Sequence, residues 1–216
     1  MAAAFLWGAT ALDAAEEAEA DGFLAALDAA VETARAGDRA AASEQLGELI
    51  EQFPGEVAVY YNLALTYEFD ADGNRYRGDN LNLAATYYQQ ALALDPGFTP
   101  ARFNLAVIWH KLGYAVEAER EYRLVMQEGG ELGRRAEINL ALVLKERGRP
   151  REAAVILTTG DEVYDDVGRV RLLALLAEDA GEPGKAIRLW KRALALDDDP
   201  TLNALAVRHL QTLRGY

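Results

Sequence analysis

The chain has 216 residues, no cysteine, two histidines and a net charge of −13 at pH 7. Without cysteine it cannot form a disulfide scaffold, a cysteine-ligated zinc site, a thiol nucleophile or a cysteine-attached haem. Two histidines are also too few for a histidine-rich metal centre. The hydrophobic fraction of 51% is ample for a folded core.

The net negative charge comes entirely from the first half of the chain. Residues 1–100 hold 4 basic and 17 acidic side chains, whereas residues 101–216 hold 18 of each. An acidic surface repels phosphate backbones, so we do not expect a nucleic-acid partner. The sequence has no run of eighteen apolar residues, so we expect no membrane-spanning helix.

The chain opens with an apolar segment, Ala2–Leu12, and its first basic residue is Arg35. A triplet similar to a signal-peptidase site ends at Ala11, but a secretory signal also needs a basic start. We therefore treat residues 1–22 as an extra segment and expect a cytoplasmic protein by default. If Met1 is not the true start and Ala2–Ala11 ends a signal peptide, the protein is periplasmic.

Residues 23–200 contain a repeat with helical spacing and regular glycine stops. The stops are Gly37, Gly113, Gly148 and Gly181, separated by about 34 residues or a multiple of that number. An Asn-Leu-Ala triplet recurs at 62–64, 104–106 and 139–141. Matching residues follow at fixed offsets: Trp109, Ala118 and Tyr122; Leu144, Ala153 and Leu157; Leu173, Ala174, Ala186, Trp190 and Ala193.

This pattern resembles the tetratricopeptide repeat (TPR) family, whose unit of about 34 residues is a helical hairpin. Small residues allow two helices to approach closely, and aromatic residues fill the space between hairpins. Each hairpin leaves an apolar face that only its neighbour can cover. We therefore expect Trp109 and Trp190 to be buried between helices.

The resemblance implies an all-α fold, a right-handed superhelical solenoid of helix-turn-helix repeats. We place five repeats at 23–56, 57–98, 99–132, 134–166 and 167–200. A C-terminal cap helix follows at 201–216, with Leu202, Leu205, Leu210 and Leu213 at its apolar positions. In the fourth repeat, Gly160 stands where a small alanine would pack, which predicts a short second helix.

The second repeat is eight residues too long, and the extra residues lie in the insertion 69–81. Its Asp-Ala-Asp-Gly-Asn stretch is similar to the start of a calcium loop. A calcium loop, however, needs glycine at its sixth and glutamate at its twelfth position. Here those positions are Arg75 and Leu81, so we interpret the insertion as a polar surface loop.

No constellation of residues suggests catalysis or a bound cofactor. His110 has no Ser, Asp or Glu at helical spacing that would form a nucleophile–base pair. Carboxylate pairs fall at expected helix ends and loops, where they cap helices. The basic run of Lys145, Arg147, Arg149 and Arg151 is interpreted as a solvated turn, with a docking patch for an acidic protein as the alternative.

The resemblance also implies a concave groove lined by the first helix of each repeat, where family members bind proteins or peptides. The groove positions are Leu27, Val31, Tyr61, Leu65, Phe69, Phe103, Val107, His110, Lys111, Arg135, Ile138, Leu142, Lys145 and Arg171. This lining is apolar for a surface and suits an amphipathic helix or an apolar segment of a partner. The alternative is that tight winding buries many of these side chains.

From the resemblance we expect a non-catalytic interaction scaffold or adaptor that supports assembly of a larger complex. The alternative is a structural accessory subunit that is permanently embedded in one complex. No feature of the sequence predicts the oligomeric state.

Overall fold

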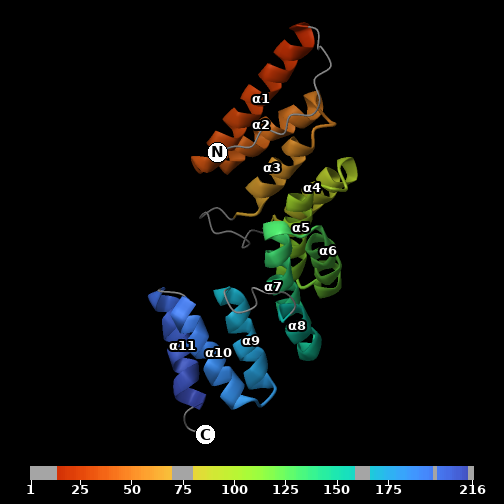
Figure 1. The fold of residues 1–216 in the computed structure, drawn as a ribbon. Helices are drawn as coiled ribbons and strands as arrows, with labels where there is room; N and C mark the ends of the chain where they lie inside the picture. The colour runs from red at the N-terminus through yellow and green to blue at the C-terminus, as the bar shows by residue number, and fades with distance from the viewer. Residues whose placement is uncertain (1–13, 70–79, 159–165, 197–198, 214–216) are drawn as a thin grey trace. The chain divides into compact units, whose positions relative to one another are not determined.

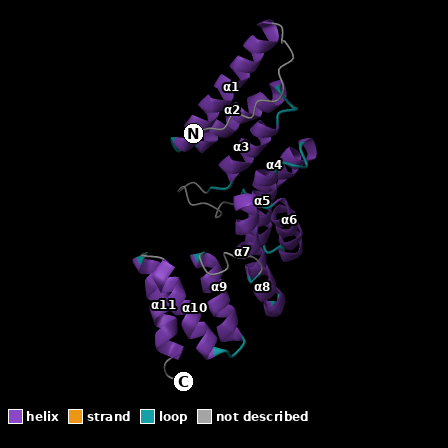
Figure 2. Ribbon diagram, viewed as in Figure 1, coloured by secondary structure: helices purple, strands orange, loops and turns teal. Residues whose placement is uncertain are grey.

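The computed structural model describes residues 14–69, 80–158, 166–196 and 199–213. Within these ranges the chain forms helices and turns and no β-sheet (Figures 1 and 2), so the expected all-α fold is confirmed. In chain order the helices are α1 (Ala14–Arg35), α2 (Arg39–Gln52), α3 (Val57–Tyr67), α4 (Leu81–Leu94), α5 (Thr99–Lys111), α6 (Ala115–Glu128), α7 (Gly130–Glu146), α8 (Pro150–Leu157), α9 (Val167–Asp179), α10 (Pro183–Leu196) and α11 (Pro200–Leu213). The apolar segment Ala2–Leu12, Gly160 and most of the 69–81 insertion lie outside the described residues.

Glycines with positive φ make the turns after α1, α5, α7 and α9. The φ angles of Gly37, Gly113, Gly148 and Gly181 are 98°, 84°, 74° and 70°. In the turn after α5, the Gly113 N–H donates to the His110 carbonyl at 3.1 Å, and the Tyr114 N–H donates to the Trp109 carbonyl at 2.8 Å. The other three turns contain the same pair of bonds. This is a Schellman motif, in which a side chain would be strained, and it confirms the predicted helix stops.

The chain divides into two compact units, residues 1–101 and 102–216. In the first unit α1, α2 and α3 pack around a core that consists of Leu27, Ala30, Leu46, Leu49, Val59 and Leu63. The rings of Phe23 and Phe53 meet edge to face beside this core, 4.9 Å apart. The pair α3–α4 buries Glu68 and Tyr88, and the Tyr88 hydroxyl donates to the Glu68 carboxylate at 2.5 Å.

In the second unit, small residues at the interfaces allow the helices to pack closely. Ala118, Ala136, Ala141, Ala153, Ala174 and Ala186 are all fully buried. Trp190 on α10 is also fully buried, as the repeat pattern predicts. Trp109 is only half-buried, and the Tyr114 ring that it contacts at 5.3 Å is itself exposed, so the expectation that Trp109 is buried between helices was wrong. Helix α8 has only eight residues, which confirms the predicted short second helix of the fourth repeat.

The cap helix α11 packs on α10 in a register that differs from the predicted one. Ala206 and Leu210 are buried, whereas Leu205 is 41% exposed. Leu213 is half-buried, and the side chain of Leu202 is outside the described set. The leucine spacing therefore misplaced part of the buried stripe, which includes the small Ala206 and excludes Leu205.

Candidate functional site

A cavity of about 370 Å³ opens between α1, α2 and α3 in the first unit. Its lining includes Val31, Leu65 and Phe69, three of the side chains that the sequence analysis assigned to the groove. All three are half-buried, so they are held in place by packing yet reachable from outside. The volume falls in the range of about 300–1,000 Å³ that is typical of ligand pockets, large enough for a bulky apolar side chain.

Two arginines line this apolar cavity. The guanidinium group of Arg39 lies 4.4 Å from the centroid of the Phe69 ring, within the distance of a cation–π interaction. Arg35 lies beside it and pairs with Glu32 at 2.5 Å. Sequence reasoning missed both arginines. The sequence offered one signal that could have identified these arginines: residues 1–100 contain only four basic side chains.

The two uncharged polar side chains that line the cavity each donate a hydrogen bond to their own helix. The Asn62 amide donates to the Ala58 carbonyl at 2.8 Å, and the Thr66 hydroxyl donates to the Leu63 carbonyl at 2.7 Å. These bonds turn the donors toward the helix backbone, so the cavity offers an apolar floor and a cationic edge.

The other two predicted groove residues of the first unit pack against other side chains of that unit and do not line the cavity. Leu27 belongs to the core of α1, α2 and α3. The ring of Tyr61 meets the rings of Phe98 at 5.1 Å and Tyr88 at 5.7 Å. The structure thus gathers Val31, Leu65 and Phe69 around one cavity and leaves Leu27 and Tyr61 outside its lining.

In the second unit two of the predicted groove side chains are covered by the chain itself. Phe103 is 3% exposed and Val107 is 9% exposed. The Phe103 ring packs on Tyr122 at 6.1 Å, and the Arg135 guanidinium lies 4.7 Å from the Phe103 ring centroid. Neither apolar side chain is therefore available to a partner in this conformation. At these two positions the side chains are buried, as the alternative of tight winding predicts.

Polar pairs connect the first helices of successive repeats in the second unit. The Nε2 atom of His110 on α5 lies 2.7 Å from a carboxylate oxygen of Glu146 on α7. The Lys145 Nζ atom lies 3.0 Å from Asp179 on α9. Of the remaining predicted groove residues, Lys111 is exposed, and Ile138, Leu142 and Arg171 are half-buried. Contacts between repeats thus engage His110 and Lys145.

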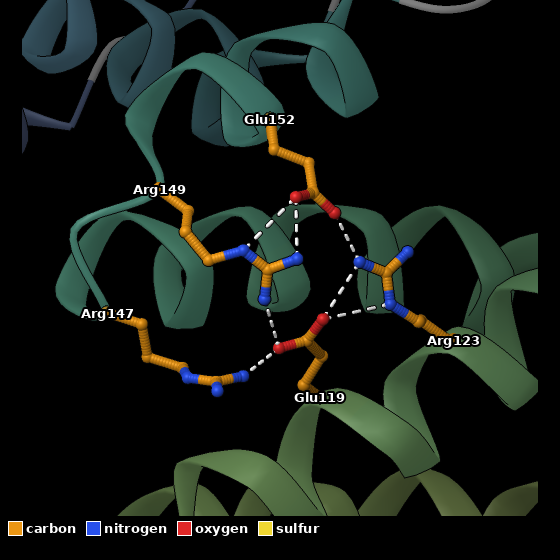
Figure 3. Close-up of polar contacts among 5 residues, drawn as sticks. All are labelled: Glu119, Arg123, Arg147, Arg149 and Glu152. Carbon is orange, nitrogen blue, oxygen red and sulfur yellow. Dashed lines mark hydrogen bonds and ion pairs between the residues drawn. The ribbon is translucent and has the colours of Figure 1, made fainter.

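Five charged residues form an ion-pair network that joins α6 to the α7–α8 turn and to α8 (Figure 3). Glu119 accepts hydrogen bonds from Arg123 at 2.9 and 3.1 Å, from Arg149 at 2.7 Å and from Arg147. Glu152 accepts from Arg149 at 2.6 and 3.1 Å and from Arg123. Arg147 and Arg149 stay about one-third exposed, but the predicted solvated turn did not include their ion pairs. These arginines attach one hairpin to the preceding one.

The network changes the acidity of its members. Burial of the Glu119 carboxylate raises its pKa, but hydrogen bonds from Arg123 and Arg149 outweigh this effect and lower the pKa below its usual value. Hydrogen bonds from the same two arginines lower the pKa of Glu152. Both carboxylates therefore stay ionised to lower pH than an isolated glutamate.

The cap helix is attached by a second polar cluster. His209 on α11 stacks on the Trp190 ring at 4.6 Å, and its Nδ1 atom lies 2.9 Å from the Glu178 carboxylate. The same carboxylate accepts a hydrogen bond from the Trp190 indole N–H. Three helices, α9, α10 and α11, therefore meet at Glu178, which gives His209 a structural role.

Within the described ranges, no three His, Asp or Glu side chains are arranged to hold a metal ion. Among the helices of these ranges, none combines the length and the apolar character needed to cross a membrane.

Comparison with known proteins identifies the fold. No family model matches the sequence, and no curated protein matches it. Similar solved structures include a tetratricopeptide repeat protein from Parabacteroides merdae, with a TM-score of 0.75 and 18% identity over 90% of this chain and 74% of that one. Pseudomonas aeruginosa PilF has a TM-score of 0.69 and 18% identity over 89% of this chain and 86% of that one. YrrB, a TPR protein with an unusual peptide-binding site, has a TM-score of 0.67 and 15% identity over 91% and 98%. These likenesses, together with the repeated motif, show that the chain has the fold of the tetratricopeptide repeat proteins.

Proposed function

We propose that the protein is a non-catalytic interaction scaffold that holds a segment of a partner protein in the cavity between α1, α2 and α3. The observation that carries this proposal is the lining of that cavity, where Val31, Leu65 and Phe69 surround an apolar space beside Arg35 and Arg39. An apolar pocket with a few polar groups at its edge is the usual form of a binding site. YrrB, which shares this fold, has a peptide-binding site.

The chemistry of the cavity specifies the partner segment. Its apolar floor takes one large aliphatic or aromatic side chain, presented by an amphipathic helix or an extended segment. Arg39 favours a single carboxylate next to that side chain, whereas Arg35 is already paired with Glu32. A longer acidic run is disfavoured, because residues 1–100 carry 17 acidic and only 4 basic side chains. The segment therefore combines a bulky apolar residue with one adjacent aspartate or glutamate.

A scaffold of this kind supports the assembly of a larger complex by holding one component through its first unit. The second unit, with its hairpins joined by the Glu119 network, supplies a stable surface for further contacts.

The test is selection from a displayed peptide library against the purified protein, with Leu65→Glu as the disrupted variant. Leu83→Glu is the matched control, because Leu83 on α4 is 44% exposed and lies outside the cavity lining. We expect the wild type and Leu83→Glu to select peptides with an apolar residue beside one acidic residue. Leu65→Glu should weaken their binding at least about ten-fold, because a charge then occupies an apolar site.

Circular dichroism must show that Leu65→Glu remains folded. If it does not, Arg39→Ala replaces it, since this arginine lies at the cavity edge. Equal binding of the selected peptides to the wild type and to the folded variant would show that the cavity is not the binding site.

A further inference from the structure

A second cavity lies in the second unit, between the start of α8, the end of α9 and the start of α10. Its volume is about 370 Å³. Leu173, Leu176 and Ala177 of α9 line it and are buried, and Ala154 of α8 lines it and is half-buried. These side chains make the inner part of the cavity apolar.

Among the described residues, the charged side chains that line this cavity are paired, with one exception. Asp179 lies 3.0 Å from the Lys145 Nζ atom, and Glu182 lies 3.3 Å from the Lys185 Nζ atom. The fourth charged lining residue, Arg151, is exposed and forms no ion pair with any residue that the structure describes. One positive charge therefore remains available at the mouth of an apolar cavity.

Backbone groups that border the cavity are already hydrogen-bonded. The Leu176 and Ala177 carbonyls accept from the N–H groups of Ala180 and Glu182, at 3.0 and 2.8 Å, and Pro150 has no N–H to donate. An extended peptide, which gains affinity from main-chain hydrogen bonds, gains little here. A partner helix needs anchors over several turns, and this short cavity offers one apolar site. A small molecule fits these constraints better than a protein segment.

We propose that this cavity binds a small aliphatic carboxylate, a molecule with a short hydrocarbon chain and a single negative charge. The chain fills the apolar interior, and the carboxylate pairs with the Arg151 guanidinium, whose planar donors match a carboxylate. A cationic ligand meets repulsion from this arginine, and a second negative charge finds no second unpaired cation in the lining. The chain is short, because the volume is near the lower end of the range of about 300–1,000 Å³ for ligand pockets.

The position of the cavity gives the ligand a structural effect. Helix α8 belongs to one hairpin, whereas α9 and α10 form the next, so a ligand in the cavity contacts both hairpins. A ligand that binds only the folded protein shifts the equilibrium away from the unfolded chain. Binding should therefore raise the Tm of the protein with increasing ligand concentration, through a site separate from the cavity between α1, α2 and α3.

The experiment is a titration of the ¹⁵N-labelled protein with sodium hexanoate, followed by NMR. We expect the largest shifts at the backbone amides of Arg151, Ala154, Ala177 and Ala180, and an affinity in about the millimolar range for so small a ligand. The neutral probe 1-hexanol should bind about three- to five-fold more weakly, because it lacks the charge that pairs with the arginine. Hexylamine should bind more weakly still.

Two variants separate the charge from the apolar interior. Arg151→Gln should bind hexanoate and 1-hexanol equally, whereas Arg208→Gln, at an exposed position of α11 outside the lining, should keep the preference. Ala154→Phe fills the cavity and should abolish binding of both probes, and Ala204→Phe on the exposed side of α11 is its control. If circular dichroism shows that Ala154→Phe unfolds, Ala180→Phe takes its place, because Ala180 lines the cavity and is exposed.

Several results would overturn the inference. These are the absence of shifts at the lining amides, equal binding of hexanoate and 1-hexanol to the wild type, and an unchanged preference for hexanoate in Arg151→Gln. The blocked dipeptide acetyl-leucyl-aspartate amide is the last probe. If it binds at the same amides more tightly than hexanoate, the cavity belongs to a protein segment and the proposed small carboxylate is wrong.

Discussion

The ion-pair network around Glu119 should be the strongest polar contribution to the second unit, and Glu119→Gln tests it. The variant keeps the size of the side chain but removes the charge that Arg123, Arg147 and Arg149 share. Each of these arginine side chains is about one-third exposed, so water replaces part of each lost interaction. Taking about 0.7 kcal/mol for each of the three pairs, a value within the range for exposed pairs, gives a loss of about 2 kcal/mol. We expect a decrease in Tm of about 6 °C.

The assay is thermal and urea unfolding followed by circular dichroism at pH 7, with Glu128→Gln as the control on the same helix. Glu128 is exposed, so its replacement should change the free energy of unfolding by no more than about 0.5 kcal/mol. The difference between wild type and Glu119→Gln should also shrink at low pH. Because the folded-state pKa of Glu119 is lowered, its contribution is complete above the unfolded pKa and disappears as the pH falls through the folded pKa. Equal stability of the wild type and Glu119→Gln at pH 7, or a difference independent of pH down to acid unfolding, would refute the assigned role.

Two further predictions concern packing and turns. Trp190→Ala should reduce the free energy of unfolding by about 3–5 kcal/mol, and Trp109→Ala by about 1–2 kcal/mol. The losses should differ because Trp190 is fully buried and Trp109 only half-buried. Equal losses in urea titrations would contradict this assignment. Gly113→Ala should reduce stability by about 1 kcal/mol, because Gly113 has a positive φ. Gly47→Ala should increase stability by about 0.5 kcal/mol, because Gly47 is inside α2 with no atom within 4 Å of an added Cβ; the reverse order of Tm would show that the turns are misassigned.

The fold follows from the sequence because its determinants are local and repeated. Gly113 requires a backbone conformation that few other residues tolerate, and Ala118 five residues later permits close helix packing. These requirements recur at Gly148 and Ala153, so each repeat supports the interpretation of the next. The register of α11 was harder to predict, because this helix occurs once. Its leucine spacing did not reveal that the small Ala206 would face α10.

The candidate site was only partly predictable for a different physical reason. The groove positions of the first unit led to Val31, Leu65 and Phe69, but nothing in the local sequence places Arg39 over the Phe69 ring. The partners of Glu119 show the same limit. Arg123 lies one helical turn away and is predictable, whereas Arg149 is 30 residues away and approaches only because one hairpin stacks on the next.

The central claim is that the cavity between α1, α2 and α3 holds a segment of a partner protein. The most direct measurement replaces Leu65 with a photoreactive amino acid in the native host, cross-links with light, and identifies the attached peptide by mass spectrometry. The same replacement at Leu83, on the exposed face of α4, is the control. We expect one recurrent adduct from Leu65, on a segment with a bulky apolar residue next to an aspartate or glutamate, and no such adduct from Leu83. No adduct from Leu65, or the same adducts from both positions, would contradict the claim.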